Sequence, residues 1–177
     1  MKLQIKDWVA TCLGISAISL IILVPGGPIE TRSFSHINPL ILGSFNTFLT
    51  TLGLGSLLLI YFVLKSERWA MGFSALCGLS YLGVYVLDLA HIFPLSPDAM
   101  PLALLTIEIF GSILSVPLMV VSIQALQGLR QPKLANASLN HADHFPLIQI
   151  PTIVITIALG MIGIGIIVFA TYSAMGL

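Results

Sequence analysis

The sequence predicts an all-α integral membrane protein that folds as a bundle of five transmembrane helices. Only 8% of the 177 residues are charged, against about 25% in an ordinary soluble domain, and 57% are hydrophobic. A soluble fold of this size needs polar side chains over most of its surface, and this chain has too few of them. The apolar runs are long and continuous, which favours helices over the alternating strands of a membrane barrel.

Five apolar runs reach the length of about 20 residues that a helix needs to cross a bilayer. The first ends at the turn Pro25–Pro28, and the second starts at Asn38–Pro39, an N-cap followed by proline at the first helical position. Pro94 ends the third run, Pro101 opens the fourth, and Pro151 lies in the first turn of the fifth. The expected helices of this single domain (1–177) cover residues 8–24, 39–64, 70–93, 101–129 and 148–172, with a polar connection at 130–146.

The basic residues predict the orientation of the helices. Lys and Arg are enriched in the cytoplasmic loops of membrane proteins. If the chain crosses the membrane five times, six of its seven basic residues lie on one side of the membrane, and Arg32 alone lies on the other side. We therefore expect a cytoplasmic N-terminus, an extracytoplasmic C-terminus and a location in a bacterial inner membrane. The first helix should be a retained anchor, because a Pro–Gly turn and no small-residue cleavage site follows it.

Two acidic residues stand out because they fall inside apolar runs, where an ionisable side chain costs about 2.5–3.5 kcal/mol to insert. At about 1.5 Å per helical residue, Asp88 of the third span and Glu108 of the fourth both lie roughly 9–10 Å from the extracytoplasmic boundary. The two spans are antiparallel neighbours joined by a short loop. The sequence therefore predicts that the two carboxyl groups lie at the same height and face each other.

Further polar side chains are predicted at the same level. His91 and Tyr85 are each three residues from Asp88 and so share its helix face, and Asn46 enters from the same side in the second span. Arg32, the lone extracytoplasmic basic residue, is suited to pair with either buried acid. The candidate binding residues are Asp88, His91, Glu108, Arg32, Glu30, His36, Asn46 and Tyr85.

This cluster is compatible with several kinds of site. Asp88, His91 and Glu108 could hold a divalent metal, and a histidine ligand favours zinc, copper, iron or nickel over magnesium or calcium. The same groups could relay protons, or a metal-activated water could hydrolyse a lipid or peptide at the outer leaflet. Alternatively, they bond only to one another and to Arg32 and fix the packing of the helices. The sequence leaves the cofactor and any catalytic residue unidentified.

We expect a membrane protein whose extracytoplasmic polar pocket binds a cation, a proton or a small polar ligand, in transport or sensing, rather than an enzyme. The alternatives are an accessory subunit of a larger membrane complex and a metal-dependent membrane hydrolase. Apart from the lipid bilayer, a homo-oligomer or a larger complex is the expected kind of partner; zero net charge gives no basis for binding nucleic acid. Small-residue patches suited to close helix packing are Ser74 with Gly78, Ala170 with Ala174, and Gly160, Gly163 and Gly165.

Overall fold

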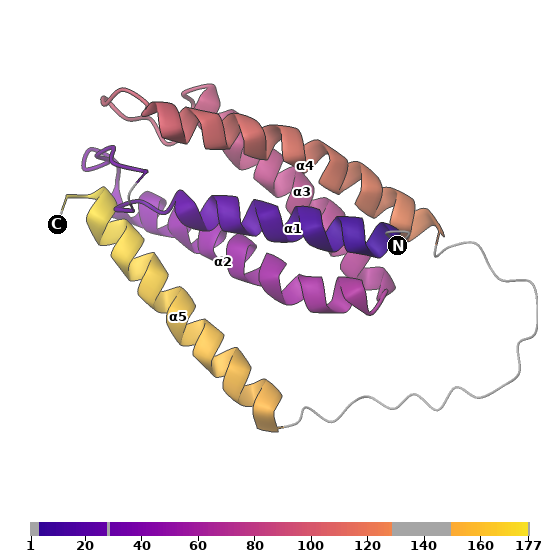
Figure 1. Cartoon of the computed structure of the whole chain (residues 1–177). Coiled ribbons are helices and arrows are strands. Elements are labelled where there is room, and N and C mark those ends of the chain that lie inside the picture. The colour runs from indigo at the N-terminus through magenta and orange to yellow at the C-terminus, as the bar shows by residue number, and fades with distance from the viewer. Residues whose placement is uncertain (1–3, 28, 129–149, 177) are drawn as a thin grey trace, which may run out of the picture.

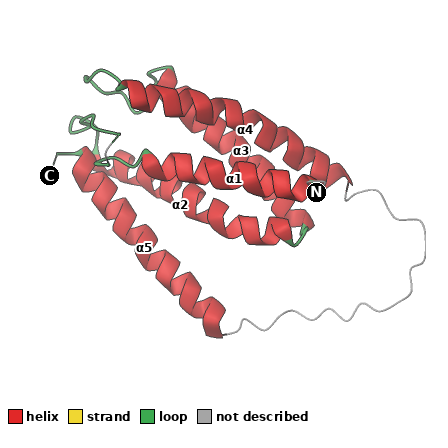
Figure 2. Cartoon of the chain, in the orientation of Figure 1, coloured by secondary structure: helices red, strands yellow, loops and turns green. Residues whose placement is uncertain are grey.

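The computed structural model describes residues 4–27, 29–128 and 150–176, and all secondary structure in these ranges is helical (Figures 1 and 2). The five helices are α1 (Ile5–Ile22), α2 (Pro39–Leu64), α3 (Arg68–Leu89), α4 (Leu102–Gly128) and α5 (Ile150–Ala174). Each is long and apolar enough to cross a membrane, which confirms the predicted number of long apolar helices. The polar connection expected at 130–146 lies outside the described residues.

The third helix ends four residues earlier than the expected position 93. His91 adopts a left-handed conformation with φ of 52°; its N–H donates to Asp88 O at 2.8 Å, and the Ile92 N–H donates to Leu87 O at 2.9 Å. These two bonds form the Schellman ending of a helix. His91 therefore lies beyond the helix and is exposed. It does not share the helix face of Asp88 that the three-residue spacing predicted.

The helices α1 to α4 enclose the core. α3 and α4 make the most extensive contact between two helices. Gly78 permits this close approach, because a Cβ there would stand 3.1 Å from Met119 N and 3.2 Å from Ser115 O. The patch of Ser74 and Gly78 thus packs within the chain. Each of the four helices contributes fully buried side chains to the core, among them Leu13, Val63, Tyr81 and Leu118.

The fifth helix stands apart from the other four. Its C-terminal end lies against the bundle and its N-terminal end lies away from it (Figure 1). Among the described helices it packs only against α2, and 17% of its apolar window is buried. At the contact, Asn46 Nδ2 donates to Thr171 Oγ1 at 3.1 Å and the Phe34 N–H donates to Ala174 O at 2.7 Å. Ala170 and Ala174 are buried there.

The surface of the bundle is apolar. Large hydrophobic side chains are exposed on every helix, and the exposed fraction reaches 80% at Leu102 and 70% at Met161. On α5, a Cβ added at Gly160 or Gly165 would meet nothing within 4 Å. Exposed apolar side chains in this number make a surface suited to contact with lipid or with another protein.

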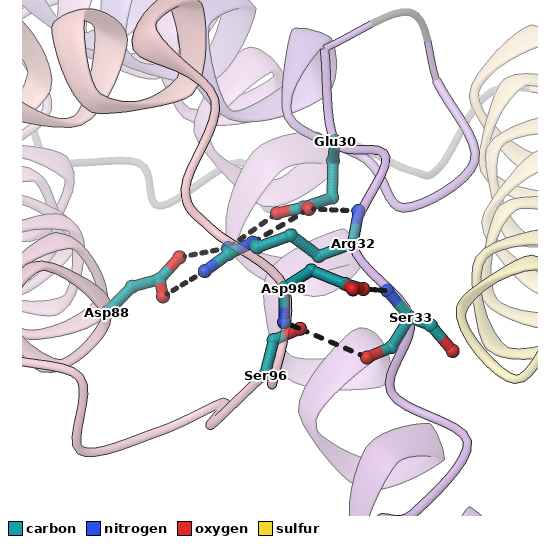
Figure 3. A network of polar contacts seen from close by, with 6 residues as sticks. All are labelled: Glu30, Arg32, Ser33, Asp88, Ser96 and Asp98. Atoms are coloured by element: carbon teal, nitrogen blue, oxygen red, sulfur yellow. Dashed lines mark hydrogen bonds and ion pairs between the residues drawn. The ribbon is translucent and has the colours of Figure 1, made fainter.

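The α1–α2 connection (described residues 23–27 and 29–38) and the α3–α4 connection (residues 90–101) close one end of the bundle (Figure 1). The two connections are bonded to each other: the Ser33 N–H donates to Asp98 Oδ2 at 2.8 Å, and the Ser96 hydroxyl donates to Ser33 O at 3.1 Å (Figure 3). This clasp holds the α1–α2 connection over the ends of α3 and α4. The side chain of Arg32 is thereby directed at α3.

Candidate functional site

Arg32 reaches from the α1–α2 connection to α3 and binds two carboxylates at once (Figure 3). Its Nη1 and Nη2 donate to Asp88 Oδ1 and Oδ2 at 3.0 and 2.7 Å, the two-pronged geometry for which a guanidinium is suited. Its Nε and Nη2 donate to the two carboxylate oxygens of Glu30 at 2.9 and 2.6 Å. All three residues are buried. The predicted pairing of Arg32 with a buried acid is confirmed for Asp88.

The charge of Arg32 is secured by these partners. Burial by itself would lower the pKa of the guanidinium, but the hydrogen bonds and charges of Glu30 and Asp88 outweigh burial and raise this pKa above its ordinary value. The group is therefore permanently positive. One positive charge thus faces two carboxylates.

Glu108 adds a third carboxyl group to this cluster. It is carried by α4, buried, and lines the same cavity of about 40 Å³ as Asp88 and Glu30. Its carboxyl group lies beside that of Asp88, as the equal depths of the two residues predicted. Its Oε2 has no hydrogen-bond partner within the protein. The antiparallel α3–α4 pair has therefore brought both buried acids to one cavity.

Two uncharged side chains complete the cavity. Tyr85 lies about one turn before Asp88 on α3, and Asn46 projects from α2. The exposed fractions of Tyr85, Asn46 and Glu108 lie between 1% and 3%. Nevertheless Tyr85 Oη and Asn46 Oδ1, like Glu108 Oε2, have no hydrogen-bond partner among the described residues. A buried polar atom without a partner costs about 1–3 kcal/mol, and few remain in native proteins. The cavity therefore offers three unused oxygen atoms to a bound group, in a volume sufficient for about two or three water-sized groups.

The two candidate histidines lie elsewhere. His36 is exposed in the α1–α2 connection, and His91 is exposed beyond the end of α3. In the part of the chain that the structure describes, no three His, Cys, Asp or Glu side chains are grouped so as to hold a metal ion. The expected metal ligands Asp88, His91 and Glu108 are thus not brought together, because the Schellman ending turns His91 away from the face of Asp88.

Two contributions to the site were not predicted from the sequence. The ring of Phe34 packs against the guanidinium of Arg32, with its centroid 5.3 Å from Cζ, which adds a cation–π contact. An aromatic residue two positions after a lone arginine is at most a weak signal of this contact. Asp98 holds the two connections together, and no local pattern could have shown that the connections meet.

Comparisons with known proteins bear on the same region. No curated protein and no solved structure is significantly similar to the chain. Residues 5–144 match a protein family described as a domain of unknown function, DUF8051. The matched residues contain α1 to α4 and every residue that lines the cavity, and they end before α5. Because the match covers most of its length, the chain belongs to the DUF8051 family.

Proposed function

We propose that this protein spans a membrane and binds a proton, or a small cation in its place, in the cavity between Asp88 and Glu108, as part of a transport or sensing function. The observation that carries the proposal is that three buried carboxyl groups line one cavity, while the guanidinium of Arg32, the one basic group bonded to them in the described part of the chain, pairs with only two of them. If all of them are ionised, negative charges exceed positive charges by two. Uncompensated charge is strongly unfavourable away from water, so the cluster gains stability by taking up a positive charge.

Glu108 is the proposed site of that exchangeable charge. Asp88 and Glu30 each accept hydrogen bonds from the positively charged guanidinium of Arg32. Glu108 Oε2 has no such partner, and the carboxyl group of Asp88 lies beside it. Two adjacent carboxyl groups with one counter-charge hold one proton between them more readily than none. In this proposal Glu108 carries the proton, and Arg32 holds Asp88 in place beside it.

The orientation proposed from the basic residues places the cavity on the extracytoplasmic side. Lys6 lies in the first turn of α1, and Lys65 and Arg68 flank the α2–α3 turn, so all three lie at the end of the bundle opposite to the cavity. Lys and Arg favour the cytoplasmic side. Arg130 and Lys133, which supported the same orientation, lie outside the described residues. A bacterial inner membrane is the proposed location.

Infrared difference spectroscopy tests the proposed proton site. We expect the purified wild-type protein at neutral pH to show the carbonyl stretch of a protonated carboxyl group, shifted in heavy water because the proton exchanges. Glu108→Gln should abolish this band, since an amide carries no such proton. Glu67→Gln, which removes an exposed acid at the opposite end of the bundle, should leave the band unchanged. A folded wild-type protein without the band, or a band that survives in Glu108→Gln, would contradict the proposal.

A second candidate function, as an accessory subunit of a larger membrane complex, is favoured by α5. That helix packs against one neighbour and leaves most of its apolar surface uncovered. In an accessory subunit, the polar cluster would serve helix packing alone. Replacing exposed α5 residues such as Met161 with alanine would then reduce the size of the complex isolated from native membranes without affecting the Glu108 band.

A further inference from the structure

We propose that the cavity takes the head of a single-chain lipophilic cation: the ammonium group of an alkylamine binds at Glu108, and its chain lies in an apolar groove between α1, α2 and α5. This inference names the class of cation for the same site and so rests on the proposed function. It depends on the groove, on the connection between groove and cavity, and on the match between the cavity and an ammonium group.

The groove lies where α5 diverges from the bundle. It has a volume of about 140 Å³ and is formed by apolar side chains of three helices. Its walls include faces of α1, α2 and α5 in the part of the chain that would be surrounded by lipid, and Leu23, Val24 and Pro25 of the α1–α2 connection complete the lining. A hydrocarbon chain can therefore enter it from the bilayer without crossing water. The larger apolar side chains that line it from the three helices are Leu20, Ile21, Leu49, Leu54, Ile166 and Phe169.

The groove and the polar cavity adjoin each other. Both are lined by Leu20, Leu23, Pro25, Asn46 and Leu49. Asn46 is the polar residue at this junction: its Nδ2 is bonded to α5, and its Oδ1 has no partner. A molecule whose chain occupies the groove thus lies beside Asn46, whose side chain also lines the cavity.

The cavity suits a small cationic head with several donors. Asn46 Oδ1, Tyr85 Oη and Glu108 Oε2 are oxygen atoms without partners, and a primary ammonium carries three N–H donors and no acceptor. The excess negative charge of the cluster attracts a cation and repels a phosphate or sulfate. A volume of about 40 Å³ admits an ammonium group but excludes the head of a phospholipid. Charge and size therefore both select an amine.

An ammonium and a proton would compete for Glu108. The titratable and charged groups around this carboxyl are Asp88 and Tyr85 of α3 and Glu30 and Arg32 of the α1–α2 connection; α1 and α2 contribute no titratable side chain to the described cavity lining. Binding of the amine should release the proton held by Glu108. Since protons occupy the same oxygen atoms, the affinity for the amine should fall as the pH falls.

Binding of dodecylamine to the purified full chain in lipid nanodiscs tests the proposal, with empty nanodiscs as the measure of simple partitioning. Dodecanol and dodecyl phosphate carry the same chain with an uncharged and an anionic head. We expect saturable binding of the amine and about tenfold or more weaker binding of both other compounds. Equal binding of dodecanol would show that the charge is not recognised, and either that result or tighter binding of dodecyl phosphate would overturn the proposal.

Paired variants locate the bound molecule. Tyr85→Phe should weaken amine binding by about threefold to tenfold, whereas Tyr81→Phe should leave it unchanged, because the Tyr81 hydroxyl donates to Ser56 Oγ at 2.9 Å outside the cavity. Ile166→Trp should block the groove, whereas Ile164→Trp, at a position that is 64% exposed and outside the groove, should not. If the two variants of either pair bind the amine equally well, the proposed position of the bound amine is wrong. If folded protein retains the Glu108 infrared band but binds no amine, this inference fails and the proposed proton site stands.

Discussion

Arg32→Gln is expected to destabilise the protein by about 3–5 kcal/mol, the cost of removing one partner from a buried ion pair. The substitution leaves the carboxylates of Glu30 and Asp88 buried without the positive charge that both now share. It also removes four side-chain hydrogen bonds. Two of them join Arg32 to Asp88 of α3, and the other two join Arg32 to Glu30 within the α1–α2 connection. The free energy of unfolding in mixed micelles with increasing dodecyl sulfate measures this loss.

Two further variants show whether the loss comes from the buried pair. Arg32→Lys keeps the charge but not the two-pronged geometry, so its loss of stability should be intermediate. Arg68→Gln removes the same side chain from an exposed position and should change the free energy of unfolding by about 0.5 kcal/mol or less. If Arg32→Gln is no more destabilising than Arg68→Gln, Arg32 is not the counter-charge of the cluster.

Gly111→Ala is expected to destabilise the protein by about 1–3 kcal/mol, the usual cost of adding atoms to a packed core. A Cβ at Gly111 would overlap with the ring of Tyr85 across the α3–α4 contact. The ring is fully buried, so it can move only by separating the two helices or by entering the cavity. The variant should therefore lose stability in the unfolding titration and weaken amine binding together.

Gly83→Ala is the matched control, because a Cβ at this position of α3 meets nothing within 4 Å. Alanine has a higher helix propensity than glycine by about 1 kcal/mol, so this variant should be as stable as the wild type or more stable. Equal stabilities for Gly111→Ala and Gly83→Ala would contradict the close contact between Gly111 and Tyr85.

Much of the fold and the centre of the site follow from the sequence. The start of α2 was predictable because Asn38 and Pro39 act locally: Asn38 Oδ1 accepts a hydrogen bond from the Leu40 N–H at 2.9 Å. The meeting of Asp88 and Glu108 was predictable because both lie equally far from one short connection. Acidic residues within long apolar runs are conspicuous in a sequence, since each needs a compensating neighbour.

The parts that were missed depend on tertiary structure or on an unusual helix ending. A helix that closes with a Schellman motif usually carries glycine at the left-handed position, and here His91 takes it, so the sequence held no sign that the helix ends before His91. The divergence of α5 was equally hidden, because an apolar pattern on all sides of a helix does not show which face packs. The clasp between Ser33 and Asp98 forms only when two distant connections meet.

A double-mutant cycle between Asp88 and Glu108 tests most directly whether the two acids and Arg32 form one site. In Asp88→Asn, the neighbouring Glu108 can ionise and take the place of Asp88 as a partner of Arg32, which limits the loss of stability. With Glu108→Gln that replacement is lost. We therefore predict that the loss of stability in the double variant exceeds the sum of the losses in the two single variants by more than about 0.5 kcal/mol. Free energies of unfolding that add within about 0.3 kcal/mol would show that the two carboxyl groups act independently, and would contradict the account.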